Sequence, residues 1–180
     1  MLYYLKYIGL GILKKIINVT KRSGLIHDSE FYIYHINDSI SVSSIPTKEY
    51  FDPISAFDAV IGFIEPNEYR SRDVEWINNT IIKYYGIPVP DYMPPSKESY
   101  QKLFDIIDTI HADIPNPRIL IHCYAGKGRS NCGAAAYLMY KHGMDSRKAI
   151  DLVEKKNPRS SMNSWQKNSL LYLEEYIPRL

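Results

Sequence analysis

The chain contains the stretch RILIHCYAGKGRS at residues 118–130. Its first five residues form a mostly apolar run of strand length, which suits a strand buried at the centre of a sheet. The rest is a loop with glycines at 126 and 128, followed by a helical pattern that opens near Arg129. A strand, a glycine-containing loop and a helix in this order predict an α/β fold, with the loop at the carboxyl end of a central strand.

The loop from Cys123 onward is suited to binding an anion. Its glycines tolerate unusual dihedrals, so the backbone N–H groups of residues 124–129 can converge on one point, where the following helix also directs its positive end. Such a cradle stabilises a thiolate, so we expect Cys123 to be ionised at neutral pH. The planar guanidinium of Arg129 matches two phosphate oxygens in a way that lysine does not. The predicted phosphate-binding residues are Tyr124, Ala125, Gly126, Lys127, Gly128 and Arg129.

The pattern H-C-x-x-G-x-x-R-S at residues 122–130 resembles the signature of the protein tyrosine phosphatase superfamily. The region from about 31 to 176 is similar to the small dual-specificity members of that superfamily. The resemblance implies hydrolysis of phosphotyrosine and phosphoserine or phosphothreonine through a phosphocysteine intermediate, without a metal or cofactor. It also implies a central, mostly parallel sheet of about five short strands, flanked by helices on both faces.

The resemblance assigns roles to individual residues. Cys123 is the implied nucleophile, and Arg129 binds the reacting phosphate. The family carries a general acid on a mobile loop roughly thirty residues before the cysteine, and Asp91 lies at that distance. The chemistry requires such an acid, because an alkoxide or phenoxide leaves poorly unless it is protonated. Ser130 is implied to hydrogen-bond the sulfur, and His122 to support the loop from behind.

Four residues near these motifs also have ordinary structural explanations. Asp91 could form a turn beside Pro90, and His122 is more consistent with a structural than a catalytic role. Cys132 fits helix packing, with a redox partner role for Cys123 as the alternative. Gln166 lies where family members often carry a polar residue near the hydrolytic water, and a solvated helix surface would explain it equally well.

Other functions remain open at the level of sequence. Phosphoinositide phosphatases of the superfamily often carry lysine at both positions flanking Ala-Gly, whereas this chain has Tyr124 and Lys127 there. A phosphoinositide or RNA 5′-phosphatase is therefore the alternative enzyme. A catalytically silent phosphate-binding module is a rival from another class, and a sulfurtransferase would need neither Arg129 nor Asp91. A nucleotide-binding Walker loop is disfavoured, because Gly128 follows Lys127 where that loop needs serine or threonine.

Composition favours an ordinary globular protein. Of the 180 residues, 45% are hydrophobic and 23% are charged, and the formal net charge is +2. A net charge this small produces no overall electrostatic attraction for nucleic acid, so we expect nucleic acid as a partner only if the RNA alternative holds. The expected substrate is a phosphorylated protein. With only two cysteines, a reducing compartment and hence the cytoplasm is the simpler expectation.

We expect an N-terminal amphipathic helix and linker at residues 1–29 and a catalytic domain at residues 30–180. The apolar stretch at 1–17 is interrupted by lysines and is shorter than a transmembrane span. Its helical periodicity instead suggests packing on the domain, on a second copy in a homodimer, or on a surface.

The remaining elements follow from periodicity and caps. A helix is predicted through Val74, Ile77, Ile81 and Ile82, ended by Gly86. A second helix is predicted after Ser96, with an apolar face reaching Ile110. Strands are predicted at 31–36, 39–42, 59–64, 87–89 and 118–122, and further helices at 131–142, 146–156 and 165–176.

Overall fold

The computed structural model describes residues 31–68 and 80–177. The chain divides into two compact units, residues 1–30 and residues 31–180, and every element below belongs to the second. The expected helix and linker at 1–29, and Val74 and Ile77 of the expected helix, lie outside the described residues. Within those residues, no helix combines the length and apolarity needed to cross a bilayer.

One mixed sheet contains five strands in the order β1-β2-β5-β3-β4. The strands are β1 (Ile33–His35), β2 (Ile40–Ser43), β3 (Ala59–Phe63), β4 (Lys83–Ile87) and β5 (Ile119–His122). β1 pairs antiparallel with β2, whereas β2, β5, β3 and β4 run parallel. The mostly parallel sheet expected from the sequence is therefore confirmed, with β5 as its middle strand.

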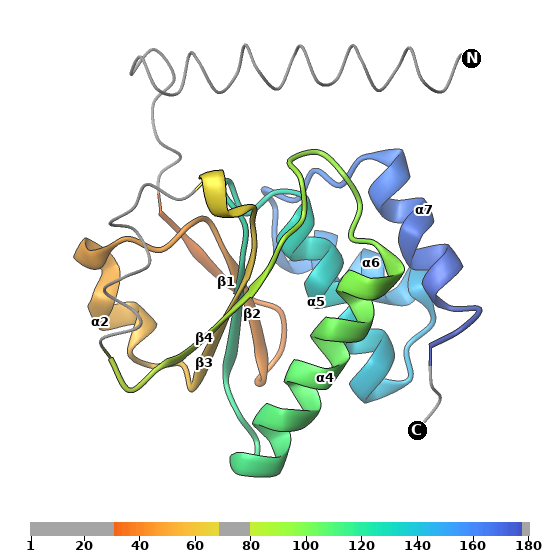
Figure 1. The fold of residues 1–180 in the computed structure, drawn as a ribbon. Coiled ribbons are helices and arrows are strands. Elements are labelled where there is room, and N and C mark those ends of the chain that lie inside the picture. The colour runs from red at the N-terminus through yellow and green to blue at the C-terminus, as the bar shows by residue number, and fades with distance from the viewer. Residues whose placement is uncertain (1–30, 69–79, 178–180) are drawn as a thin grey trace, which may run out of the picture. The chain divides into compact units, whose positions relative to one another are not determined.

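Helices cover both faces of this sheet, as expected. They are α2 (Phe51–Ile54), α4 (Lys97–Asp113), α5 (Arg129–His142), α6 (Ser146–Lys156) and α7 (Ser164–Leu173). Figure 1 shows the short α2 on one side of the sheet and α4, α5, α6 and α7 on the other. Two 3₁₀ turns, at Lys48–Tyr50 and Pro66–Glu68, complete the described elements.

The core fixes the middle of the sheet. Every residue of β2, β3 and β5 is buried. Alternate residues point to opposite faces, so Ile121 joins the large cluster beneath α5 while Leu120 joins the smaller cluster around Ile54 of α2. Each fully buried aliphatic side chain contributes about 1.5 to 3 kcal/mol to folding. A one-residue shift of β5 would exchange the residues that face the two clusters, so the loop that follows β5 has a well-defined origin.

The expected helix ended by Gly86 is wrong over its described part, and the strand expected at 87–89 begins earlier. Lys83–Ile87 forms β4, paired in parallel with β3 so that Gly86 lies opposite Gly62. Ile82 is buried against the α2 side, whereas Ile81 is fully exposed. The apolar spacing resembles a helical period, but pairing with β3 overrides this local pattern.

The ends of the helices agree with the predictions from sequence more closely than the region around Gly86 does. The hydroxyl of Ser96 accepts a hydrogen bond from the N–H of Ser99 at the start of α4, as predicted. α5 begins at Arg129, two residues before the predicted start at 131, and ends at Gly143 in the left-handed conformation. α7 begins at Ser164 and ends at Leu173, three residues short of the predicted end.

Candidate active site

Three segments that carry charged or nucleophilic groups follow three neighbouring parallel strands. The loop from Cys123 follows β5, the turn containing Glu68 follows β3, and Asp91 follows β4. Because the carboxyl ends of parallel strands meet at one edge of a sheet, these groups converge there. The arrangement brings together residues that are far apart along the chain.

Cys123 is only 2% exposed. The backbone N–H of Gly126 donates to Sγ over 3.2 Å, and the hydroxyl of Ser130 lies 3.4 Å from Sγ. α5 begins at Arg129, so its positive end faces the same loop. The sulfur thus has a backbone N–H and a hydroxyl as neighbours, beside the start of α5.

The guanidinium of Arg129 is buried, with 2% of the side chain exposed. Nη1 donates to Glu68 Oε2 over 2.6 Å and to the carbonyl of Val89 over 2.9 Å. Nη2 donates to Glu68 Oε1 over 3.1 Å and lies 3.0 Å from Asp91 Oδ1. Glu68, only 6% exposed, therefore forms a bidentate ion pair with Arg129 through both carboxylate oxygens.

The guanidinium of Arg129 remains positively charged despite its burial. Burial alone would lower the pKa of Arg129, but Cys123, Glu68 and Asp91 together raise the pKa above its ordinary value. A fixed positive charge beside the sulfur is what a phosphate dianion would meet on entering the loop.

Buried amides support the loop from behind. The side-chain N–H groups of Asn131 and Asn157 both donate to the carbonyl of Gly126 over 3.2 Å, and Asn157 also donates to Asn131 Oδ1 over 2.9 Å. The hydroxyl of Tyr32 donates to the carbonyl of Ala125 over 2.7 Å. These bonds fix the carbonyls of Ala125 and Gly126, and the N–H of Gly126 faces the sulfur.

His122 lies behind the loop at the end of β5 and is completely buried. Its Nδ1 is 3.2 Å from the carbonyl of Cys123, so that nitrogen carries the hydrogen, and Nε2 accepts from the hydroxyl of Tyr84 over 3.1 Å. Burial lowers the pKa of His122 to about 4. The imidazole is therefore neutral at physiological pH and linked to the loop through backbone, away from the sulfur.

The other predicted residues lie at different depths. Lys127 is exposed on the rim of the loop, and Tyr124 is half-buried, its carbonyl accepting from the N–H of Ile45. Cys132 is fully buried in α5, and burial raises the pKa of its thiol far above the ordinary value. Gln166 is 2% exposed, so the solvated helix surface considered for it is wrong.

Sequence reasoning missed Glu68, Asn157 and Tyr32. Glu68 is 61 positions from Arg129, Asn157 is 31 from Gly126, and Tyr32 is 93 from Ala125. No local pattern links such pairs. One feature of the sequence did point to Glu68. It lies shortly after a predicted buried strand, and the carboxyl ends of such strands form the edge where the Cys123 loop was predicted to lie.

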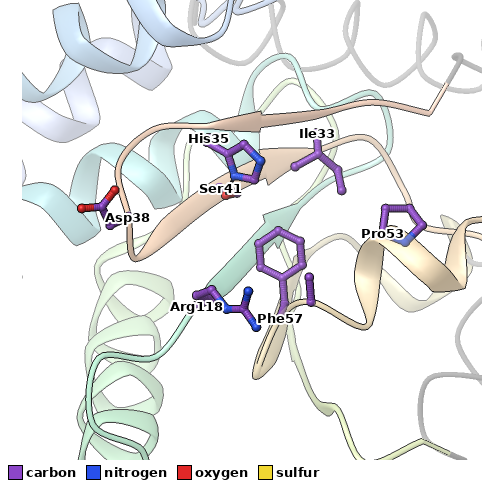
Figure 2. Close-up of a pocket in the computed structure, with 8 residues that line it drawn as sticks. Ile33, His35, Asp38, Ser41, Pro53, Phe57 and Arg118 are labelled. Atoms are coloured by element: carbon purple, nitrogen blue, oxygen red, sulfur yellow. Dashed lines mark hydrogen bonds between the residues drawn. The ribbon is translucent and has the colours of Figure 1, made fainter.

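A separate hollow of about 320 Å³ lies on the α2 side of the sheet. Its lining residues are Ile33, His35, Asp38, Ser41, Pro53, Ala56, Phe57 and Arg118. Figure 2 shows the imidazole of His35 close to Ser41, to which its Nδ1 is hydrogen-bonded at 2.8 Å. None of these residues belongs to the Cys123 loop or to the segments that contact Arg129, so the hollow is distinct from the candidate site.

Among residues 31–68 and 80–177, no group of three or more His, Cys, Asp or Glu side chains is arranged to hold a metal ion. The carboxylates of Glu68 and Asp91 are both directed at Arg129.

Curated proteins with similar sequences are phosphatases. Dual specificity protein phosphatase 1 of Arabidopsis thaliana is 37% identical over 82 residues, which are 45% of this chain and 40% of that protein. Protein tyrosine phosphatase type IVA 2 of Mus musculus is 31% identical over 93 residues, 52% of this chain and 53% of that protein. The chain thus spans about half, or less, of the length of these relatives.

Solved structures share the fold over most of the chain. Tk-PTP in its active form is 29% identical, with a TM-score of 0.68, over 81% of this chain and 97% of that one. PTPMT1 in complex with PI(5)P has a TM-score of 0.72 over 80% of this chain and 95% of that one, at 19% identity. The latter likeness concerns the fold alone.

A family model describes the catalytic part directly. The model of the dual specificity phosphatase catalytic domain matches residues 53–176, which include Glu68, Asp91 and the whole loop from Cys123 to Ser130. The match covers more than two thirds of the chain and agrees with the fold and with the cysteine at the end of β5. The chain therefore belongs to the dual specificity phosphatase catalytic domain family, within the cysteine-based protein tyrosine phosphatase superfamily.

Proposed function

We propose that the chain hydrolyses phosphotyrosine and phosphoserine or phosphothreonine in protein substrates through a phosphocysteine intermediate on Cys123. The observation that carries the proposal is the convergence on one loop of a sulfur with two hydrogen-bonding neighbours, a buried arginine and the Asp91 carboxylate. Each is a group that metal-independent displacement at phosphorus requires.

In the first step, the Cys123 thiolate attacks phosphorus while the bond from phosphorus to the leaving oxygen breaks. Asp91 donates its proton to that oxygen, so a phenol or an alcohol departs. Arg129 binds two of the equatorial oxygens. An incoming dianionic phosphate competes with Asp91 for Nη2 of Arg129, 3.0 Å away, and this releases the carboxyl group toward the leaving oxygen.

In the second step, water attacks the phosphocysteine. Asp91, now a carboxylate, accepts a proton from that water as the new oxygen–phosphorus bond forms and the sulfur–phosphorus bond breaks. Ser130 lies 3.4 Å from Sγ and hydrogen-bonds the departing thiolate. Inorganic phosphate leaves, and the enzyme is regenerated.

Turnover of p-nitrophenyl phosphate in EDTA tests this proposal. Cys123→Ser should abolish turnover while leaving phosphopeptide binding intact, because the backbone N–H groups that form the cradle do not depend on the sulfur. Cys132→Ala is the matched control and should remain active, since Cys132 is buried in α5. Residual activity of Cys123→Ser above about 1% of wild type would contradict the nucleophile assignment, given typical losses of roughly a million-fold.

The same assay separates the rival classes. A silent phosphate-binding module would bind phosphopeptides without turnover by the wild-type chain. A sulfurtransferase would consume thiosulfate and leave phosphate esters intact.

One observation favours phosphoinositides or RNA 5′ ends as the substrate instead. The exposed Lys127 lies on the rim, two residues before Arg129, where it could meet a second anionic group. If it does, Lys127→Ala should raise KM about fivefold for a doubly phosphorylated substrate and spare p-nitrophenyl phosphate, with the difference shrinking in salt. A mutant-to-wild-type ratio that is equal for both substrates would exclude recognition by Lys127.

A further inference from the structure

Gln166 lies in the first turn of α7, between the Cys123 loop and the segment that carries Asp91. Both atoms of its amide have backbone partners: Oε1 accepts from the N–H of Asn163 over 3.1 Å, and Nε2 donates to the carbonyl of Met93 over 3.2 Å. The amide also packs against Gly128, because a Cβ added there would lie 2.8 Å from Oε1 and 2.9 Å from Nε2. Gln166 thus joins three segments and is almost completely buried.

Asn163 makes a similar hydrogen bond to the residue before Met93, Tyr92. Its Oδ1 accepts from the N–H of Gln166 over 3.0 Å, which caps α7, and its Nδ2 donates to the carbonyl of Tyr92 over 2.8 Å. The two residues form a capping box, so the start of α7 is itself rigidly defined. The carbonyls of Tyr92 and Met93, which directly follow Asp91, are therefore both held by the start of one helix.

The held segment has a conformation that needs such support. Tyr92 has φ of 63°, in the left-handed region that non-glycine residues rarely adopt. Its side chain is half exposed, so packing of the ring contributes little to holding this backbone. The turn is closed by the N–H of Met93, which donates to the carbonyl of Pro90 over 3.1 Å. The hydrogen bonds from Asn163 and Gln166 thus add contacts from a distant helix to the local one, in which the N–H of Tyr92 donates to Asp91 Oδ1 over 3.1 Å.

We propose that Gln166 and Asn163 are positioning residues that hold the Tyr92–Met93 backbone and thereby keep the Asp91 carboxyl group over the Cys123 loop. The proposal rests on the function proposed above, in which Asp91 is the general acid. A glutamine that oriented the hydrolytic water would need a polar atom directed at the sulfur, whereas both polar atoms of Gln166 are directed at backbone groups. The Asp91 segment is then held from two sides, by α7 through the carbonyls of Tyr92 and Met93 and by Arg129 through the Asp91 carboxylate.

This assignment predicts which step suffers when the contact is lost. A misplaced acid impairs protonation of the leaving oxygen in the first step, and the loss grows as the leaving group becomes a poorer one. A misplaced water would instead slow the second step, so that phosphocysteine accumulates and the first turnover appears as a burst of released phenol.

Two substitutions test the contact with the Asp91 segment. Asn163→Asp leaves the cap of α7 in place, because it keeps Oδ1 for the N–H of Gln166 and aspartate is a good N-cap, but it removes the donor to the carbonyl of Tyr92. Gln166→Ala removes the donor to Met93 together with the acceptor for the N–H of Asn163. The control is Asp145→Asn, the reverse change at the N-cap of α6, where the cap partner is the N–H of Lys148.

Two measurements decide the matter. The first is kcat/KM over a series of aryl phosphates, with pre-steady-state release of the phenol. Both test variants should lose about 10-fold to 100-fold on poor leaving groups and less than about threefold on good ones, the size expected for a small displacement of a catalytic group. A burst of phenol with unchanged kcat/KM in Gln166→Ala would overturn the proposal, because it would assign Gln166 to the water.

The second measurement is hydrogen exchange of the backbone amides at 91–93, which does not depend on catalysis. Exchange should be faster in both test variants and unchanged in Asp145→Asn. Unchanged exchange in both test variants would overturn the proposal whatever the kinetics. Absence of turnover by the wild-type chain would instead refute the proposed function, while the exchange result would still decide whether α7 holds the Asp91 segment.

Discussion

Glu68→Gln removes the negative charge that Arg129 contacts most closely. Glu68 meets the guanidinium with two oxygens, at 2.6 and 3.1 Å, and the two side chains are 6% and 2% exposed. Glutamine keeps one acceptor but turns an N–H group toward a guanidinium that only donates. Asp91, at 3.0 Å and 23% exposed, remains as partial compensation.

The magnitude follows from the burial of this pair. Leaving one partner of a buried ion pair uncompensated costs about 3 to 5 kcal/mol, and the remaining Asp91 places the expected loss near the lower end, at about 3 kcal/mol. For a domain of this size the melting temperature should fall by about 6 to 12 °C. Because Arg129 also loses a fixed orientation, kcat/KM on phosphate monoesters should fall by about 10-fold or more.

Urea unfolding followed by tryptophan fluorescence gives the free energy of unfolding for Glu68→Gln. Glu175→Gln, at an exposed position near the end of α7, is the control and should change stability by less than about 0.5 kcal/mol. Inorganic phosphate should restore part of the stability lost in Glu68→Gln, because it supplies negative charge to Arg129. If Glu68→Gln unfolds like the control and gains nothing from phosphate, Glu68 does not hold Arg129.

Three further predictions concern other parts of the site. Gly126→Ala should lose at least about 3 kcal/mol of stability and most turnover, since its φ is 67° and a Cβ would lie 2.7 Å from the backbone of Ser43. The control Gly143→Ala, with φ of 60° and open space around it, should lose only about 1 to 2 kcal/mol. Equal losses in urea unfolding would refute the steric argument. The pKa of His122 is about 4 when folded and 6.5 when unfolded. Between these two values the unfolded chain binds a proton that the folded chain does not, so the free energy of unfolding should fall by about 3 kcal/mol on acidification from pH 6.5 to 4. His122→Gln should flatten that part of the stability profile, and an unchanged slope would count against a buried neutral imidazole. Asp91→Asn should lower kcat by at least about 100-fold for poor leaving groups and flatten the alkaline limb of the pH profile, whereas a change below about threefold across all leaving groups would remove Asp91 from the mechanism.

The sequence by itself determined the parts of the protein that are local along the chain. The loop is one continuous segment, and Ser130, which the family resemblance implied would contact the sulfur of Cys123 seven positions away, lies 3.4 Å from it. The cap at Ser96 and the left-handed Gly143 were predictable for the same reason, because a helix end is made by residues within one turn of it. The order of strands and helices then predicted the sheet and the edge at which the loop lies.

Only the tertiary structure decided which distant groups meet at that edge. Glu68 reaches Arg129 across 61 positions and Gln166 reaches Met93 across 73, and such contacts leave no period or spacing in the sequence. The same limit explains the error around Gly86, where pairing with β3 outweighs a pattern that locally resembles a helix. Local backbone preferences and caps act over a few residues, whereas the partners of a buried charge depend on how the sheet brings its strand ends together.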